Sequence, residues 1–144
     1  MELNIIPLTH ERLDALLEVE QNAFSKPWSR QQFLGELASD ATRYFLAEAD
    51  GRIVGYAGAW LIVDEVQITN IAVHSDYRRL GIGKALLSHL LNATREEGAT
   101  FYSLEVRRSN RPAQALYESQ GFSVQGERKN YYGDEDALIM LKEF

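Results

Sequence analysis

The sequence predicts an α/β fold in which a mixed, mostly antiparallel sheet carries helices on both faces. After a short N-terminal strand, the strand-like runs rich in apolar residues span 44–49, 53–63, 65–73, 101–106, 123–131 and 137–141. The Asp50-Gly51 pair between the first two runs is a strong hairpin signal. A helical pattern separates the third run from the fourth, so these two strands form one parallel pair. The last two runs close the sheet as an antiparallel pair.

Length and composition bound the class of protein. With 144 residues, 45% of them hydrophobic, the chain is long enough for one domain over residues 1–144 and too short for two. A formal charge of −6 argues against nucleic-acid binding and mildly favours a cationic partner. The absence of Cys excludes disulfides, thiolate metal sites and a cysteine nucleophile, and three dispersed His residues predict no metal site. Without a secretory leader or an apolar run of ~20 residues, the expected location is cytoplasmic, with no membrane segment.

The first elements are a strand over residues 2–8 and two short helices. Thr9 is the expected N-cap of the first helix, whose apolar side carries Leu13, Leu16, Leu17 and Phe24. Ser29 starts the second helix, and Gln32 stands in the capping-box position three residues later. These two helices precede the main part of the sheet.

The long run 65–73 changes face midway. Its apolar residues fall first at even and then at odd positions: Val66, Ile68, Ile71 and Val73. A strand cannot change face without an extra residue, so we expect a β-bulge near Thr69 and Asn70. Bulges often lie beside active sites, because they turn backbone groups out of the ladder towards a ligand.

Two glycines, Gly81 and Gly83, open the helix after this strand. The first N–H groups of a helix lack intrahelical acceptors and lie at the positive end of the helix dipole, so they favour an anion. Glycine lets the backbone approach that anion, and Arg78, Arg79 and Lys84 place three cations around the turn. A phosphate or pyrophosphate is the expected ligand; an ordinary strand-to-helix turn is the alternative.

The spacing of this turn excludes two common phosphate-binding motifs. A Walker loop would need Gly and Ser or Thr where Arg78 and Ala85 stand, and a dinucleotide fingerprint would need Gly at Leu86. What remains is Arg-x-x-Gly-x-Gly, formed by Arg78, Gly81 and Gly83. This motif resembles the acetyl-CoA pyrophosphate loop of the GNAT acetyltransferase superfamily.

The resemblance covers most of the chain and implies a GNAT-type sheet whose parallel strands splay apart. It implies acetyl-CoA as cosubstrate, with its pantetheine arm in the gap and one backbone N–H of the bulged strand stabilising the oxyanion. The residues expected to bind the cofactor are Ile71, Ala72, Val73, Arg78, Arg79, Leu80, Gly81, Ile82, Gly83, Lys84 and Asn110. Leu80 departs from the basic or polar residue frequent in that loop, but only its backbone is expected to matter.

A second motif lies on the helix after residue 106. Asn110 is the expected N-cap, Pro112 follows in the first turn and Gly121 ends the helix. Tyr117 lies about two turns beyond Asn110, so cap and phenol share a face. By resemblance, Tyr117 would protonate the departing CoA thiolate and Asn110 would contact the cofactor. The alternative is a tyrosine packed in the core.

Glu105 is a carboxylate within an otherwise apolar strand, between Leu104 and Val106. A buried carboxylate is costly unless it is paired or used, which makes Glu105 a candidate general base. The resemblance supports this role. The alternative is an outward-facing residue, because strand alternation groups it with Ser103 and Arg107.

Both ends of the chain resemble protein N-terminal acetyltransferases, above all the bacterial ribosomal-protein-alanine N-acetyltransferases. The segments that carry this likeness are Phe24, 26–29, 128–132, Asp136-Ala137 and Met140. The resemblance implies that a protein N-terminus is the acceptor, namely the N-terminal alanine of small-subunit ribosomal protein number eighteen. Trp28, Tyr131 and Tyr132 would then bind this substrate; the alternative is that either tyrosine only packs an edge strand.

Two other functions fit the same residues. One is an acetyltransferase for small-molecule amines of the polyamine type. The other is a non-catalytic acyl-CoA-binding module, which would bind the cofactor without turnover. Because there is no Cys to carry an acyl intermediate, an enzyme of this kind is expected to transfer the acetyl group directly to the amine.

Overall fold

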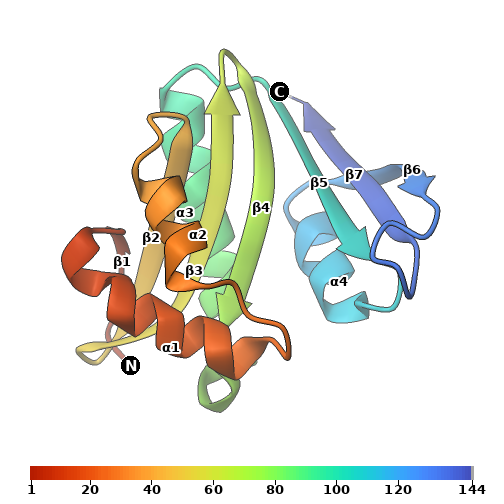
Figure 1. Cartoon of the computed structure of the whole chain (residues 1–144). Helices are drawn as coiled ribbons and strands as arrows, with labels where there is room; N and C mark the ends of the chain where they lie inside the picture. The colour runs from red at the N-terminus through yellow and green to blue at the C-terminus, as the bar shows by residue number, and fades with distance from the viewer. Residues whose placement is uncertain (144) are drawn as a thin grey trace.

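A seven-stranded mixed sheet in the order β1-β2-β3-β4-β5-β7-β6 forms the centre of the structure (Figure 1). The computed structural model describes residues 1–143. The strands are β1 (Leu3–Pro7), β2 (Thr42–Ala49), β3 (Arg52–Ile62), β4 (Glu65–Val73), β5 (Phe101–Arg107), β6 (Ser123–Arg128) and β7 (Ala137–Glu143). Within the described residues, β4 and β5 are parallel and the other neighbouring pairs are antiparallel. The predicted fold class is therefore confirmed.

Helices cover both faces of the sheet. They are α1 (Leu13–Ala23), α2 (Arg30–Leu37), α3 (Ile82–Glu96) and α4 (Arg111–Ser119), with 3₁₀ turns at η1 (His10–Arg12) and η2 (Ser75–Tyr77). Figure 1 shows α1 and α2 in front of β2 to β4 and α3 behind them. On the first face, Leu16 and Phe33 pack with Tyr44 and Tyr56 in one buried cluster. On the other face, α3 and α4 contribute to a second cluster that also contains residues of β2 to β5.

Local sequence signals account for most element boundaries. Asp50 and Gly51 have φ values of 50° and 85°, the left-handed backbone that a two-residue hairpin turn needs. The Ser29 hydroxyl accepts from the Gln32 N–H at 3.2 Å, and the Ser29 N–H donates to the Gln32 side chain at 2.9 Å. The hairpin and the capping box are both confirmed.

Three expected boundaries were wrong. Thr9 holds the N-cap position of η1 rather than of α1, without a capping side-chain bond, because the chain first makes a 3₁₀ turn closed by the bond from Arg12 N–H to the Thr9 carbonyl. Phe24 follows α1 in extended backbone and is 42% exposed, so it does not join the apolar side of that helix. Strand β6 ends at Arg128, before a turn in which Asn130 takes a positive φ of 54°.

The irregularity in β4 is the predicted bulge. Gly58 pairs with Asn70 while the next residue of β3, Ala59, pairs with Ile68, so Thr69 is the extra residue. The Thr69 hydroxyl donates to the Gly58 carbonyl at 3.1 Å and holds the bulge against β3. This extra residue moves the apolar side chains of β4 from one face to the other, as the sequence pattern requires.

The parallel strands pair over a short distance only. Residues 65–67 of β4 pair with residues 101–103 of β5, and the two strands then separate, as Figure 1 shows. The separation begins just before the bulge, so among residues 1–143 the second half of β4 has no strand partner on its β5 side. The splayed parallel pair is confirmed.

Candidate active site

A cavity of about 400 Å³ lies where β4 and β5 have separated. The segment between α1 and α2 forms one wall, and α4 with the β6–β7 loop forms the other. Six of the residues predicted to form the site lie in its lining: Trp28, Ile71, Glu105, Asn110, Tyr117 and Tyr132. These residues come from five separate parts of the chain, so the fold gathers them at one place.

Other predicted site residues lie outside this lining. Ala72 is buried in the cluster beneath α1 and α2, and Val73 packs against the α3 cluster. Tyr131 is 51% exposed and places its ring 5.0 Å from that of Tyr132, edge to face. The residues of the glycine turn, 78–84, lie at the start of α3, beyond the end of β4.

Glu105 lies on the open face of β5. Its neighbours Leu104 and Val106 are buried in the core, and its own side chain is 16% exposed. One carboxylate oxygen accepts from Arg128 Nε at 3.2 Å and the other from Gln67 Nε2 at 3.3 Å. The carboxylate is thus paired and oriented while it faces the cavity. Its remaining lone pairs can accept a proton.

Tyr117 presents a buried phenol to the same cavity. Tyr117 is 8% exposed, and its hydroxyl has no hydrogen-bond partner among residues 1–143. Burial, and then the neighbouring Tyr132, raise the pKa of Tyr117 above its ordinary value. The phenol therefore stays protonated at neutral pH and can donate its proton. Asn110 supports this position by capping α4 through the Ala113 N–H at 3.2 Å.

The β6–β7 loop is held against the site by charge. The Arg107 guanidinium lies over the Tyr132 ring, 4.3 Å from its centroid. The same guanidinium donates to Asp134 at 2.8 Å and to Glu135 at 3.1 Å. The hydrogen bond from Arg107 lowers the pKa of Asp134. This arrangement fixes Tyr132 in the cavity wall.

Sequence reasoning missed Glu20, which also lines the cavity and is 2% exposed. A signal for it exists, because it continues the buried stripe of α1 formed by Leu13, Leu16 and Leu17. A carboxylate at such a position needs a hydrogen-bonded partner or a use. Asn70 was placed at the bulge but not in the site, and its side chain reaches the lining as well.

The glycine turn has the geometry of an anion site. Gly81 is the N-cap of α3 with φ 81°, and no side chain caps the first N–H groups of the helix. Arg79 takes a positive φ of 63°, and the side chains of Arg78, Arg79 and Lys84 are exposed around the turn. Free N–H groups at a positive helix end together with three cations fit the pyrophosphate that the sequence predicts.

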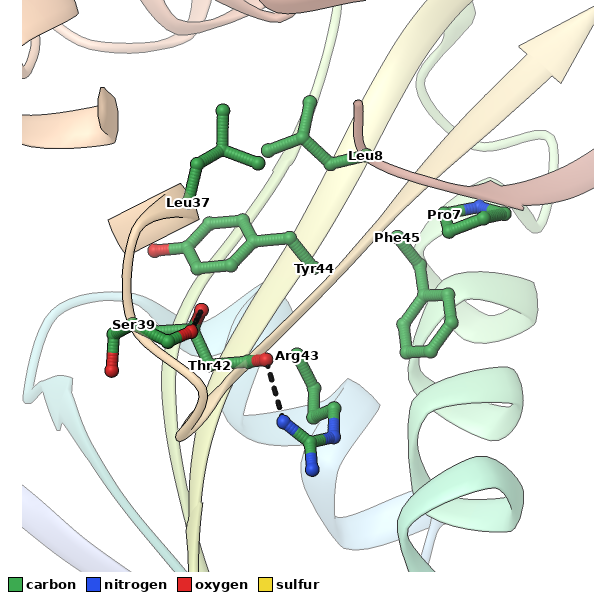
Figure 2. A pocket seen from close by; sticks show the side chains of 8 residues that line it. All are labelled: Pro7, Leu8, Leu37, Ser39, Thr42, Arg43, Tyr44 and Phe45. Carbon is green, nitrogen blue, oxygen red and sulfur yellow. Dashed lines mark hydrogen bonds between the residues drawn. The ribbon is translucent and has the colours of Figure 1, made fainter. Parts of the chain in front are cut away.

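A second cavity, of about 370 Å³, lies between β1, β2 and the end of α2 (Figure 2). Its charged group, Arg43, is fully engaged: it donates to both Glu97 oxygens at 2.8 Å and to the carbonyl of Thr42 at 2.8 Å. The Tyr44 hydroxyl donates to Glu36. With its polar groups already paired, this cavity offers little to a ligand, and the first cavity is the candidate site.

Among residues 1–143, no group of His, Cys, Asp and Glu side chains could hold a metal ion. No helix in this range is both long and apolar enough to span a bilayer.

The family model described as the Acetyltransferase (GNAT) family matches residues 13–122. This match covers both cavity walls except the β6–β7 loop, together with the whole glycine turn. The chain belongs to the GNAT acetyltransferase family and is an acyltransferase.

Two relatives and one solved structure are similar to most of this chain. An Escherichia coli K12 [ribosomal protein bS18]-alanine N-acetyltransferase is 40% identical over 89% of this chain and 88% of its own length. A Bacillus subtilis protein provisionally named for the same activity is 43% identical over 90% of this chain and 88% of its own. The crystal structure of the Escherichia coli ribosomal-protein-S18-alanine N-acetyltransferase matches with a TM-score of 0.92 and 38% identity, covering 99% of this chain and 94% of that one.

Proposed function

We propose that this protein transfers the acetyl group of acetyl-CoA to a protein N-terminal α-amine, and that its acceptor is the N-terminal alanine of ribosomal protein bS18. The observation that carries this proposal is the meeting of Glu105 and Tyr117 in one cavity at the separated strands. A candidate proton acceptor and a candidate proton donor thus share the space that opens beside the bulge. The named relatives support the choice of acceptor.

In this proposal the protein binds cofactor and amine together. The N–H groups at the start of α3 hold the pyrophosphate, with Arg78, Arg79 and Lys84 around it. The unpaired backbone of β4 at residues 71–73 lies along the pantetheine arm, and one of its N–H groups polarises the thioester carbonyl. Asn110 contacts the cofactor from the start of α4.

The amine then attacks the thioester carbon directly. A C–N bond forms and the C–S bond breaks, while Glu105 takes the proton from the amine, directly or through a water. Tyr117 gives its proton to the departing thiolate. Trp28 and Tyr132 form opposite walls of the slot through which a main chain would enter, with Tyr131 packed behind Tyr132.

Acid–base arithmetic favours an α-amine over a lysine side chain. At pH 7, deprotonating an α-amine of pKa about 8 costs about 1.4 kcal/mol, whereas a lysine amine of pKa about 10.4 costs about 4.6 kcal/mol. A carboxylate such as Glu105 can meet the first cost far more easily than the second.

A panel of acceptors tests the proposal. Acetyl-CoA is incubated with a peptide that begins with a free alanine and carries the bS18 N-terminal sequence, with the same peptide blocked at its N-terminus but containing lysine, and with a polyamine. Mass spectrometry should find the acetyl group on the free α-amine alone. Equal rates on the first two acceptors, or activity on the polyamine alone, would contradict the assignment.

A further inference from the structure

A buried carboxylate in α1 lies at the cavity without a part in the proposed chemistry. Glu20 is 2% exposed and belongs to the same helix face as Leu13, Leu16 and Leu17. Burying a carboxylate among such residues is unfavourable unless hydrogen bonds replace its water. The hydrogen-bond partners of the Glu20 carboxylate therefore indicate its role.

Both oxygens of Glu20 accept hydrogen bonds from different parts of the fold. The Tyr56 hydroxyl, on β3, donates to Oε1 at 2.5 Å, and the backbone N–H of Trp28 donates to Oε2 at 2.9 Å. Asn70 Nδ2, in the bulge of β4, donates to the Tyr56 hydroxyl at 3.1 Å. The carboxylate thus joins α1, the segment between α1 and α2, and the two strands that carry the bulge.

The joined parts include the acceptor side of the cavity. Trp28 and Asn70 line it together with Glu20, and Trp28 lies in a segment that has no helix or strand of its own. Burial, followed by the charge of Glu20, raises the pKa of Tyr56, so this phenol remains a permanent donor. The distance between the Trp28 wall and the bulge is therefore set by hydrogen bonds to one carboxylate.

We propose that Glu20 is a positioning residue for the acceptor: it fixes the Trp28 wall relative to the bulged strand and so sets the affinity for the incoming peptide. It acts through Trp28 and Tyr56 rather than on the reacting atoms. This inference rests on the proposed function, because it assigns Glu20 to the acceptor side of the same reaction.

A second buried glutamate provides a matched control. Glu36, in α2, is 9% exposed and accepts hydrogen bonds from the Tyr44 hydroxyl at 3.0 Å and from Trp60 Nε1 at 3.0 Å. It belongs to the same helical layer and has the same kind of partners, but it does not line the cavity. Loss of its charge should lower stability without changing the acceptor wall.

The test compares Glu20→Ala, Glu20→Gln and Glu36→Gln in steady-state kinetics with the free-alanine peptide, together with acetyl-CoA affinity and thermal unfolding. Glu20→Ala should raise the peptide KM roughly 10- to 100-fold, with kcat at saturating peptide and acetyl-CoA affinity little changed. Glu20→Gln should raise it less, because the amide oxygen can still accept from the Trp28 N–H. Glu36→Gln should lower the unfolding temperature and leave the peptide KM as in the unmodified protein.

If Glu20→Ala does not fold, Tyr56→Phe replaces it, because this variant removes one partner of Glu20 and keeps the carboxylate. Tyr56→Phe should also raise the peptide KM. Equal peptide KM values in the Glu20 and Glu36 variants would overturn the inference. So would a fall in kcat at unchanged KM, because that would place Glu20 at the reacting atoms. Absence of peptide acetylation by the unmodified protein would overturn the proposed function as well, so the two failures are distinguishable.

Discussion

Glu105 and Tyr117 differ in how the protein holds them, and the difference matches their proposed roles. Glu105 accepts hydrogen bonds from two donors, Arg128 and Gln67, and these keep its carboxylate oriented. Tyr117 has no hydrogen-bond partner among residues 1–143, so its proton is uncommitted. A supported acceptor and an unengaged donor are what direct transfer of an acetyl group requires.

Replacing Tyr117 with Phe should lower kcat by roughly 10² to 10⁴ and leave acetyl-CoA binding nearly unchanged. The reason is that a thiol of pKa about 8.5 departs more readily when a phenol of pKa about 10 or above can donate a proton to it. Stopped-flow or steady-state kinetics with calorimetric cofactor titration measures both quantities. Tyr102→Phe is the control, because Tyr102 is also buried but its hydroxyl is hydrogen-bonded with Thr94 of α3, outside the cavity. A Tyr117→Phe variant with normal kcat would make Tyr117 a packing residue only.

Replacing Glu105 with Gln should strongly reduce the rate at neutral pH, and higher pH should restore part of it. The amide cannot take a proton from the amine, but above pH 8 a larger share of the α-amine is already neutral. Rates measured from pH 6.5 to 9.5 for this variant and the unmodified protein give the comparison. Parallel pH profiles with the same rate would show that Glu105 takes no proton.

Among the helices, α3 is distinguished by its first turn. Gly81 supplies the left-handed backbone at the N-cap, and Gly83 follows within the first turn of the helix. The 3₁₀ turn η2, which precedes the glycine turn, is joined to α1: the Ser75 N–H donates to Asn22 Oδ1 at 2.8 Å and Asn22 Nδ2 donates to Ser75 Oγ at 3.1 Å. The last turn of α1 therefore connects the proposed cofactor side of the site with its proposed acceptor side.

Gly83→Val should leave a folded protein whose acetyl-CoA affinity is lower by roughly tenfold or more, a loss of about 1.4 kcal/mol or more. A Cβ at this position would lie 3.5 Å from Leu116 Cδ2, which is an ordinary contact, so the fold tolerates it, but a branched side chain crowds the pyrophosphate. Calorimetry measures the affinity. Gly35→Ala, in open space within α2, should keep it unchanged; equal affinities in all three proteins would contradict the phosphate-loop assignment.

For the protein as a whole, the buried tyrosines decide the response to alkali. Burial is the main cause that raises the pKa values of Tyr44, Tyr56 and Tyr117 in the folded state. The unfolded chain loses these protons near pH 10, so it binds fewer protons than the native state above that pH, and stability falls as pH rises. Below pH 10 these groups are protonated in both states and contribute no pH dependence.

The free energy of unfolding should therefore decline above pH 10, by about 1.4 kcal/mol per pH unit for each buried tyrosine. Denaturant titrations at pH 8, 10 and 11, followed by circular dichroism and by tyrosinate absorbance, measure the slope. Tyr56→Phe should make this slope shallower by the contribution of one tyrosine, about 1.4 kcal/mol per pH unit. Full ionisation of the tyrosines near pH 10 in a still-folded protein would contradict the prediction.

Periodicity and turn chemistry in the sequence determined the elements, because these signals act between residues close in the chain. The Asp50-Gly51 hairpin, the Ser29 capping box, the bulge at Thr69 and the glycine turn at Gly81 each depend on local backbone preferences, and each was predicted. The three wrong boundaries lie where a second local conformation competes: a 3₁₀ turn before α1, an extended segment after it and a left-handed turn after β6.

The three-dimensional fold alone decided which side chains share the cavity. Glu105 and Tyr117 could be named from their motifs, but their meeting with Trp28 and Tyr132 depends on the separation of β4 from β5. Glu20 was missed because its role comes from Tyr56 and Trp28, whose distance from it along the chain is up to 36 residues. Hydrogen bonds between distant segments leave no periodic pattern in a sequence, because they form only when the helical layer packs on the sheet.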